Sequence, residues 1–177
     1  MAAFTELKEA LYNIFSRMFP ITQVIHMYDG GVEPSNPYIG IYILAFNQVG
    51  REETTSYASE TSLDSNIYQL STKVTYEASV QISCRGSTAG DLAHAVNQDL
   101  NIPTTWQILR ENNLSKMRVS NVRSAPQLRE TKWIQAYNQD ITFAYCYVSD
   151  TPIDVIEQVI IVDTQTGDTY KIPENIG

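Results

Sequence analysis

The chain has 177 residues, of which 43% are hydrophobic and 18% are charged. This length and composition predict one globular domain, residues 1–177, that buries a core without disulfides, metal or cofactor. The formal net charge of −8 disfavours ordinary nucleic-acid binding, which depends on Lys and Arg displacing the counterions of phosphates.

The N-terminal residues predict an amphipathic helix over Thr5–Met18, with Thr5 as a candidate N-cap and Pro20 as a stop. Its apolar positions share one helical stripe: Phe4, Leu7, Leu11, Ile14, Phe15 and Met18. Glu6 and Glu9 interrupt the apolar run and no basic stretch precedes it, so we do not expect a secretion signal. No apolar run approaches the roughly 18 residues that cross a membrane.

The next segments predict two strands and a long connection. Gln23–Tyr28 predicts a short strand, and Tyr38–Gln48 is apolar on both alternating faces, which is typical of an interior strand or of one covered by a neighbouring subunit. Gly50–Asn66 has no useful periodicity, and loops this long in a compact domain are usually functional or disordered. We interpret it as an extended arm of a hairpin that contacts other subunits, the alternative being an idle surface loop.

The clearest pattern is the strand Lys73–Gly86, which is followed by a helix over Ser87–Leu100. One alternating row is expected to be buried: Val74, Tyr76, Ala78, Val80, Ile82 and Cys84. The other row is expected to face solvent: Thr75, Glu77, Ser79, Gln81, Ser83 and Arg85. The helix can fold back over the buried row because its own apolar residues recur at helical spacing.

The second half of the chain continues as a short helix and several strands. Thr104–Asn112 predicts a helix with Trp106 and Leu109 facing inward. Pro152 is expected to break the chain. The expected strands are Met117–Val122, Lys132–Tyr137, Asp140–Val148, and a last hairpin of Val155–Val162 with Thr169–Ile172.

Together these elements predict an α+β fold in a single two-layer domain. Its sheet is mixed but mostly antiparallel, and two main helices pack on one face. A long hairpin loop over residues 50–66 and a C-terminal hairpin appendage over residues 152–177 complete it.

Residues suited to catalysis or metal binding are sparse. The histidines, His26 and His94, have no Cys or His at metal-ligand spacing. The cysteines, Cys84 and Cys146, lie in strand-like runs, where reduced thiols buried among apolar groups are expected. We therefore expect no catalytic residue, cofactor site or metal site, and no enzyme.

Two loops could imitate ligand sites. Gly86–Gly90 precedes a helix but lacks the lysine of a phosphate-binding loop, so a helix cap by Ser87 or Thr88 explains it more simply. Asp163–Asp168 lacks the alternating acidic ligands of a calcium loop and is interpreted as a hairpin turn. The eleven tyrosines, taken together, favour contacts with other subunits, although they could equally line the core.

Three stretches carry a resemblance to a known family. They are residues 18–57, MFPITQVIHMYDGGVEPSNPYIGIYILAFNQVGREETTSY, the strand Tyr76–Arg85 with its following helix, and the strand from Gln135 to Tyr145. They resemble the neck or tail terminator proteins of tailed bacteriophages, particularly those with contractile tails. The resemblance covers most of the chain in order of elements, and the C-terminal hairpin is a departure from it.

The resemblance implies a non-enzymatic structural protein of the virion neck, assembled in the host bacterial cytoplasm. Six copies would form a ring that terminates the tail tube, anchors the last sheath layer and docks on the head connector or stopper proteins. Genomic DNA would pass through the lumen without sequence-specific binding. No membrane partner is expected. The acidic composition agrees, because a negatively lined bore repels phosphates.

The resemblance also implies that subunits meet through the long hairpin loop and the exposed sheet face. The candidate interface residues are Arg51, Glu52, Glu53, Tyr57, Glu77, Gln81 and Arg85. Two alternatives stay open: another head–tail joining component, such as a stopper, tail completion or tail tube protein, and a small ligand-binding domain. An assembly arm should be mobile in the monomer and ordered in a ring, which distinguishes the first interpretation from the last.

Overall fold

The computed structural model describes residues 2–30, 34–35, 37–58, 67–129, 131–154, 159–162 and 169–172. Side chains are described for residues 2–30, 34–35, 37–56, 70–128 and 131–151. The chain divides into two compact units, each described by itself. The first comprises Met1–Glu52 and Val74–Tyr147, and the second comprises Glu53–Lys73 and Val148–Gly177.

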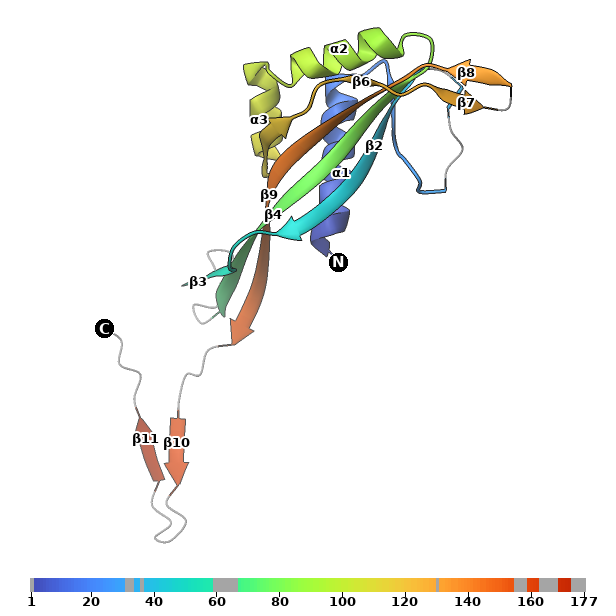
Figure 1. Cartoon of the computed structure of the whole chain (residues 1–177). Helices are drawn as coiled ribbons and strands as arrows, with labels where there is room; N and C mark the ends of the chain where they lie inside the picture. The colour runs from blue at the N-terminus through green and yellow to red at the C-terminus, as the bar shows by residue number, and fades with distance from the viewer. Residues whose placement is uncertain are drawn as a thin grey trace. The chain divides into compact units, whose positions relative to one another are not determined.

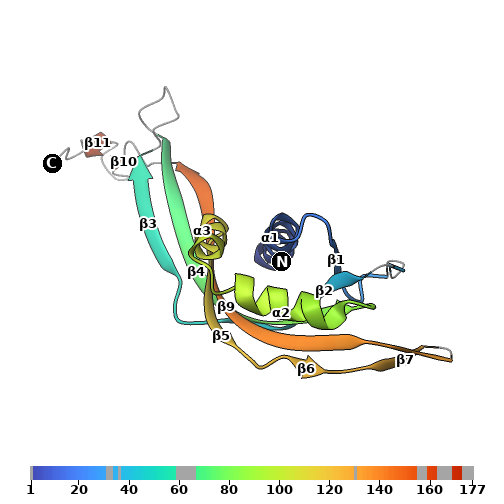
Figure 2. The same cartoon turned by 90° about the horizontal axis from the view of Figure 1, so that it is seen from above.

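Three helices lie on one face of the sheet in the first unit (Figures 1 and 2). They are α1 (Ala2–Met18), α2 (Ala89–Asp99) and α3 (Pro103–Glu111). The N-terminal helix begins earlier than expected, so Thr5 lies inside it and the predicted N-cap at Thr5 is wrong. Proline starts α3, where the fixed φ of proline and its missing N–H cost nothing.

The strands of the sheet have the order β1-β2-β4-β9-β5, with β3 paired to β4 and β6 paired to β9. Their bounds are β1 (Gln23–His26), β2 (Tyr38–Gln48), β3 (Glu53–Ala58), β4 (Ile67–Arg85), β5 (Leu114–Val119), β6 (Arg123–Ser124) and β9 (Ala136–Asp154). β1 runs parallel to β2, and the other registered pairs are antiparallel. The prediction of an α+β fold with a mixed, mostly antiparallel sheet is therefore confirmed.

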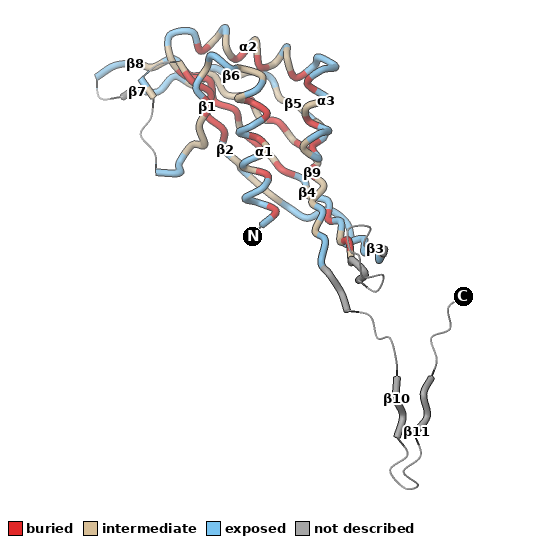
Figure 3. Tube along the Cα trace, turned by 180° about the vertical axis from the view of Figure 1, so that it is seen from behind, coloured by how far each residue is buried: buried red, intermediate tan, exposed pale blue. Residues whose placement is uncertain are grey.

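The core lies between the helices and the sheet (Figure 3). The predicted buried row of β4 is confirmed at five positions, and its sixth member, Tyr76, is partly buried and stacks on Phe46 with ring centroids 4.3 Å apart. From the helices, Leu7, Leu11 and Leu109 are almost fully buried. Each such side chain contributes about 1.5–3 kcal/mol of transfer free energy, so this layer dominates the stability of the first unit.

The second unit contains one strand, β3, within residues that were predicted to form a loop. β3 pairs antiparallel with Tyr68–Lys73 of β4, so residues 53–58 are a strand and not part of a structureless arm. β10 (Val159–Val162) pairs with β11 (Thr169–Ile172), which confirms strands in the predicted C-terminal hairpin. Residues 59–66, 155–158 and 163–168 fall outside the described residues, including the predicted turn at Asp163–Asp168.

Several predicted boundaries need correction. β1 ends at His26 and not at Tyr28, and β5 begins at Leu114 and not at Met117. β9 continues through Pro152, which a strand tolerates where the proline nitrogen faces no ladder partner. The expected connection after Ser124 contains β7 (Gln127–Arg129), which forms a hairpin with β8 (Lys132–Ile134).

Candidate functional site

The sheet face opposite the helices carries the polar row of β4 from which candidate interface residues were chosen. Tyr42 lies opposite Gln81, and Tyr38 lies opposite Arg85, in the antiparallel register of β2 and β4. A β-bulge at Ile43–Ala45 shifts the register once. The helices all lie on the other side of the sheet, so no described helix covers this polar row (Figure 2).

Exposure falls steadily along this row toward the end of β4. Glu77 is exposed, Gln81 is half-buried, and Ser83 and Arg85 retain 1% and 7% of their exposure. The expectation that Arg85 and Ser83 face solvent is therefore wrong. Only the Glu77 end of the row is open.

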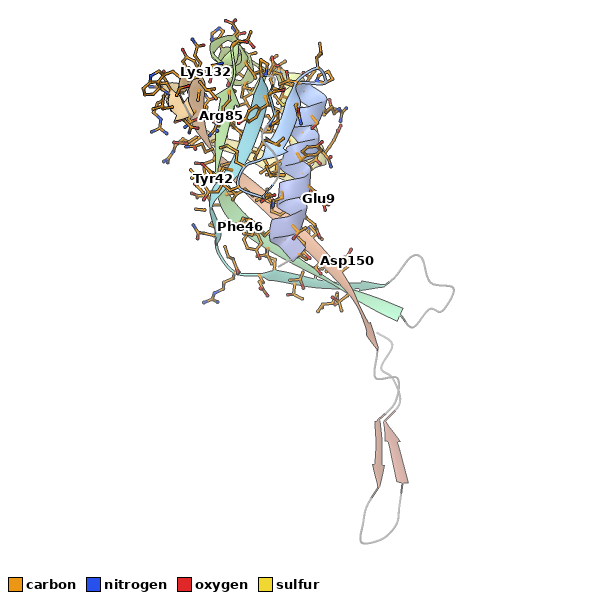
Figure 4. All side chains as sticks on the ribbon, turned by 90° about the vertical axis from the view of Figure 1, so that its right-hand side faces the viewer. Glu9, Tyr42, Phe46, Arg85, Lys132 and Asp150 are labelled. Atoms are coloured by element: carbon orange, nitrogen blue, oxygen red, sulfur yellow. The ribbon has the colours of Figure 1, made fainter. Side chains whose placement is uncertain are left out.

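Arg85, labelled in Figure 4, donates hydrogen bonds to two hydroxyl groups of its own sheet. Its Nε donates a hydrogen bond to Ser83 Oγ at 3.2 Å, and its Nη1 donates to the Tyr38 hydroxyl at 3.4 Å. Burial raises the pKa of Tyr38, and the Arg85 charge partly opposes that rise. A buried charge with hydrogen-bonded donors avoids much of its desolvation cost, so Arg85 acts here as a structural side chain.

The turn after β1 closes the same face of the sheet. A Cβ on Gly40 would lie 2.6 Å from the Met27 sulfur, so only glycine lets Met27 lie flat on β2. Tyr28 has a positive φ of 66°, and its exposed ring packs edge-on against Tyr42 with centroids 5.0 Å apart. This turn therefore accounts for part of the burial that the alternation in β4 does not predict.

Gln81 is joined to two other strands through one carboxylate. Gln81 Nε2 donates to Asp140 Oδ1 at 3.1 Å, and Arg123 Nη2 donates to Asp140 Oδ2. The Asp140 backbone N–H also donates to Ser120 Oγ at 2.9 Å. The network connects β4, β9 and β6, and nothing in the sequence brings Asp140 and Arg123 to Gln81.

The remaining candidates lie near the β2–β3 connection. Arg51 and Glu52 are exposed and belong to the first unit. Glu53 is exposed at the start of β3 and, like Tyr57, belongs to the second unit. The side chain of Tyr57 lies outside the described residues, although its backbone pairs with Gln69.

The histidines and cysteines differ in exposure: Cys84 is buried, His26 is half-buried and His94 is exposed. Both cysteines are free; burial raises the pKa of Cys84 to about 12, and Cys146 is half-buried. His26 Nε2 is 3.0 Å from the Lys8 carbonyl oxygen, and burial lowers the pKa of His26. Cys84 is thus a neutral thiol and a poor nucleophile at ordinary pH.

Within the described ranges, no group of three His, Cys, Asp or Glu side chains could hold a metal ion. The loop before α2 also differs from expectation, because Thr88 occupies the N-cap position without a side-chain capping bond. Gly86 has φ of +110°, and a Cβ there would lie 2.7 Å from Pro37 Cα, which explains glycine at the end of β4.

Two exposed apolar side chains, one on α3 and one on β5, differ from the expectation or were missed. Trp106 is 51% exposed, so the prediction that it faces inward is wrong, although Leu109 is buried as expected. Met117, the residue at the register shift of β5, is 60% exposed. The sequence offered one sign that Met117 is exposed: it stands beside Arg118 in a run that alternates poorly between apolar and polar residues.

The helices of the described part of the chain are too short or too polar to cross a membrane. A comparison with curated proteins finds no significant match. The model of one family, described as phage neck terminator protein, matches residues 6–168. The match extends over most of α1, all of α2 and α3 and the whole sheet, and the chain therefore belongs to the phage neck terminator protein family.

Proposed function

We propose that six copies of this chain form a ring that terminates the phage tail tube and sheath and joins the tail to the head connector. The family match over residues 6–168 carries this proposal, because it extends over nearly every element of the first unit. A structural role in joining tail and neck follows from the family itself, as does a place in the virion tail. The ring, its stoichiometry and the contractile type of tail belong to the proposal.

The ring would act without catalysis, as a conduit for genomic DNA. The net charge of −8 supports a passive role, because a ring of such chains repels phosphate more than it attracts it. Partners would be the tail tube and sheath proteins on one side and connector or stopper proteins on the other.

Two groups of exposed side chains support contact with those partners or with a neighbouring copy. Glu77 lies on the open end of the β4 row, and Arg51, Glu52 and Glu53 are exposed at the β2–β3 connection. Gln81 stays a candidate at the border of the open region. Arg85 is withdrawn as a contact residue because its own chain buries it.

The oligomeric state tests the ring directly. Mass photometry of the full chain, alone and with purified tail tube and sheath proteins, should show a species near 120 kDa, which is six times the 20.0 kDa of one chain. Negative-stain images of the same samples should show sixfold rings with a pore that admits duplex DNA. A strict monomer under all these conditions would contradict the proposal.

A second experiment asks whether the ring terminates tails. Tails assembled without this chain should continue to grow or fail to join heads, and added chain should restore joining. If tails of normal length join heads without it, another neck component performs this step.

A further inference from the structure

The α3–β5 edge, defined by Trp106, Arg110, Met117 and Arg118, is one end of the sheet. Among the described strands, β5 has a ladder partner only in β9, so its outer side is unpaired. Trp106 and Met117 are exposed there, and Trp106 Nε1 already donates to the Leu100 carbonyl at 3.1 Å. The exposed part of the indole ring is therefore apolar surface without a further hydrogen-bonding need.

A depression of about 320 Å³ lies at this edge, and Trp106, Arg110 and Lys116 are among its lining residues. Lys116 Nζ is committed to its own chain, at 2.8 Å from the Leu100 carbonyl and 2.7 Å from Asn101 Oδ1. Arg110 and Arg118 are exposed, and no described carboxylate lies within ion-pair distance of either. The α3–β5 edge thus combines exposed apolar groups with two available guanidinium groups.

The sequence concentrates positive charge in this part of the chain. Residues 116–132 contain five of the twelve basic side chains and one of the twenty acidic ones. The rest of the chain holds the other seven basic and nineteen acidic side chains, so its average charge is negative. A basic edge on an acidic protein is complementary to another copy of the same protein.

The α1–β1 edge, defined by Phe4, Glu9, Tyr12 and His26, is the opposite end of the strand order. A cleft of about 580 Å³ is lined by these four residues together with Thr5, Lys8, Asn13 and Asp29. Phe4 and Tyr12 are 40% and 44% exposed.

The available charge in this cleft is negative. Lys8 Nζ is paired with Asp29 Oδ2 at 2.6 Å, which neutralises both groups. The Glu9 carboxylate is exposed on α1 (Figure 4) and has no described cation within ion-pair distance.

We propose that the α3–β5 edge of one copy docks on the α1–β1 edge of the next copy, with Trp106 against the aromatic cleft and Arg110 beside Glu9. Trp106 and Arg110 are four residues apart on α3, and Glu9 and Tyr12 are three apart on α1, so each pair shares a helix face. Because the two edges differ, the contact is head-to-tail, and a head-to-tail contact closes into a ring when its rotation permits. This inference rests on the proposed ring and names the surfaces that build it.

A charge swap tests this contact. Arg110→Glu alone and Glu9→Arg alone should each raise the concentration at half-assembly at least about ten-fold, because like charges then meet in the contact. The double variant Arg110→Glu with Glu9→Arg should recover most of the loss. Trp106→Ala should weaken assembly without being rescued by either charge change.

Lys132→Glu is the matched control, since it makes the same change of charge at an exposed position on β8, outside both edges. Thermal melting of the charge variants should match that of the wild type, because Glu9, Arg110 and Lys132 are exposed. Normal rings from Arg110→Glu, or a double variant as defective as the singles, overturn this inference and leave the proposed ring standing. Loss of tail or DNA binding with normal rings assigns the edge to that partner and also overturns it. A wild type that never assembles overturns both.

Discussion

The two faces of β2, β4 and β9 in the first unit are formed by alternate residues of the same strands, yet they are covered in different ways. Three helices cover one face with a continuous apolar layer, and Phe143, Ile141 and Ile82 lie there almost without exposure. The other face has no helix, and its cover near Arg85 comes in part from a turn that follows β1. Alternation thus determines which side of a strand a residue faces, while distant segments determine whether that side is wet.

Truncating the helix-covered face should have the largest effect. Phe143→Ala should lower the free energy of unfolding by about 3–5 kcal/mol, because it leaves a cavity in a packed layer. Thr142→Ala, the neighbouring change on the open face, should cost less than about 1 kcal/mol. Urea unfolding followed by circular dichroism measures both values, and similar losses would show that the two faces are not packed differently.

Two changes within the polar row of β4 sharpen the comparison. Arg85→Ala should lower the free energy of unfolding by about 1–3 kcal/mol, because it removes a buried side chain and the hydrogen bonds that it donates to Ser83 and Tyr38. Glu77→Ala, on the same face at the open end, should change it by no more than about 0.5 kcal/mol. Equal effects in the same urea titration would contradict a graded closure of this face.

The smallest effect appears only at alkaline pH and concerns Tyr145 on the covered face. Burial, assisted by the Glu6 charge, raises the pKa of Tyr145 to about 12 from its ordinary value of 10.0. The unfolded chain therefore releases this proton first, so the stabilisation is complete below pH 10 and is lost as the pH rises toward 12. Tyr145→Phe should flatten the decline of unfolding free energy between these pH values.

Burial also raises the pKa of Tyr38 and of Cys84, so the informative quantity is the difference in unfolding free energy between the wild type and the variant. Tyr12→Phe is a suitable control, because Tyr12 is exposed. If both variants follow the wild type above pH 10, Tyr145 is not the group that links stability to pH.

The sequence predicted the helix-covered layer well because one physical rule determines it. The period-two row from Val74 to Cys84 and the helical stripe of α1 both mark residues that must leave water. Leu109 near the end of α3 is buried as its helical spacing predicted. Trp106 is not, because a large aromatic residue is compatible with either a core or an exposed edge.

What the sequence could not predict depends on contacts between distant segments. The pairing of Gln81, Asp140 and Arg123 joins three strands, and no local pattern anticipates it. β3 was missed because Glu53–Ala58 is polar on both faces, so it shows no hydrophobic alternation. Of the seven candidate interface residues, Arg85 is buried in its own chain, and the roles of the other six stay predictions.

The contact between Gly40 and Met27 limits where another protein can lie on this sheet. Met27 packs against Gly40 and occupies the space that a partner's side chain would need. The end of β2 near Tyr38 is therefore already covered by its own chain. A partner approaching the helix-free side would first meet Tyr42 and Leu44, both of which are exposed. The missing side chain of Gly40 therefore directs docking toward the part of the sheet that begins at Tyr42.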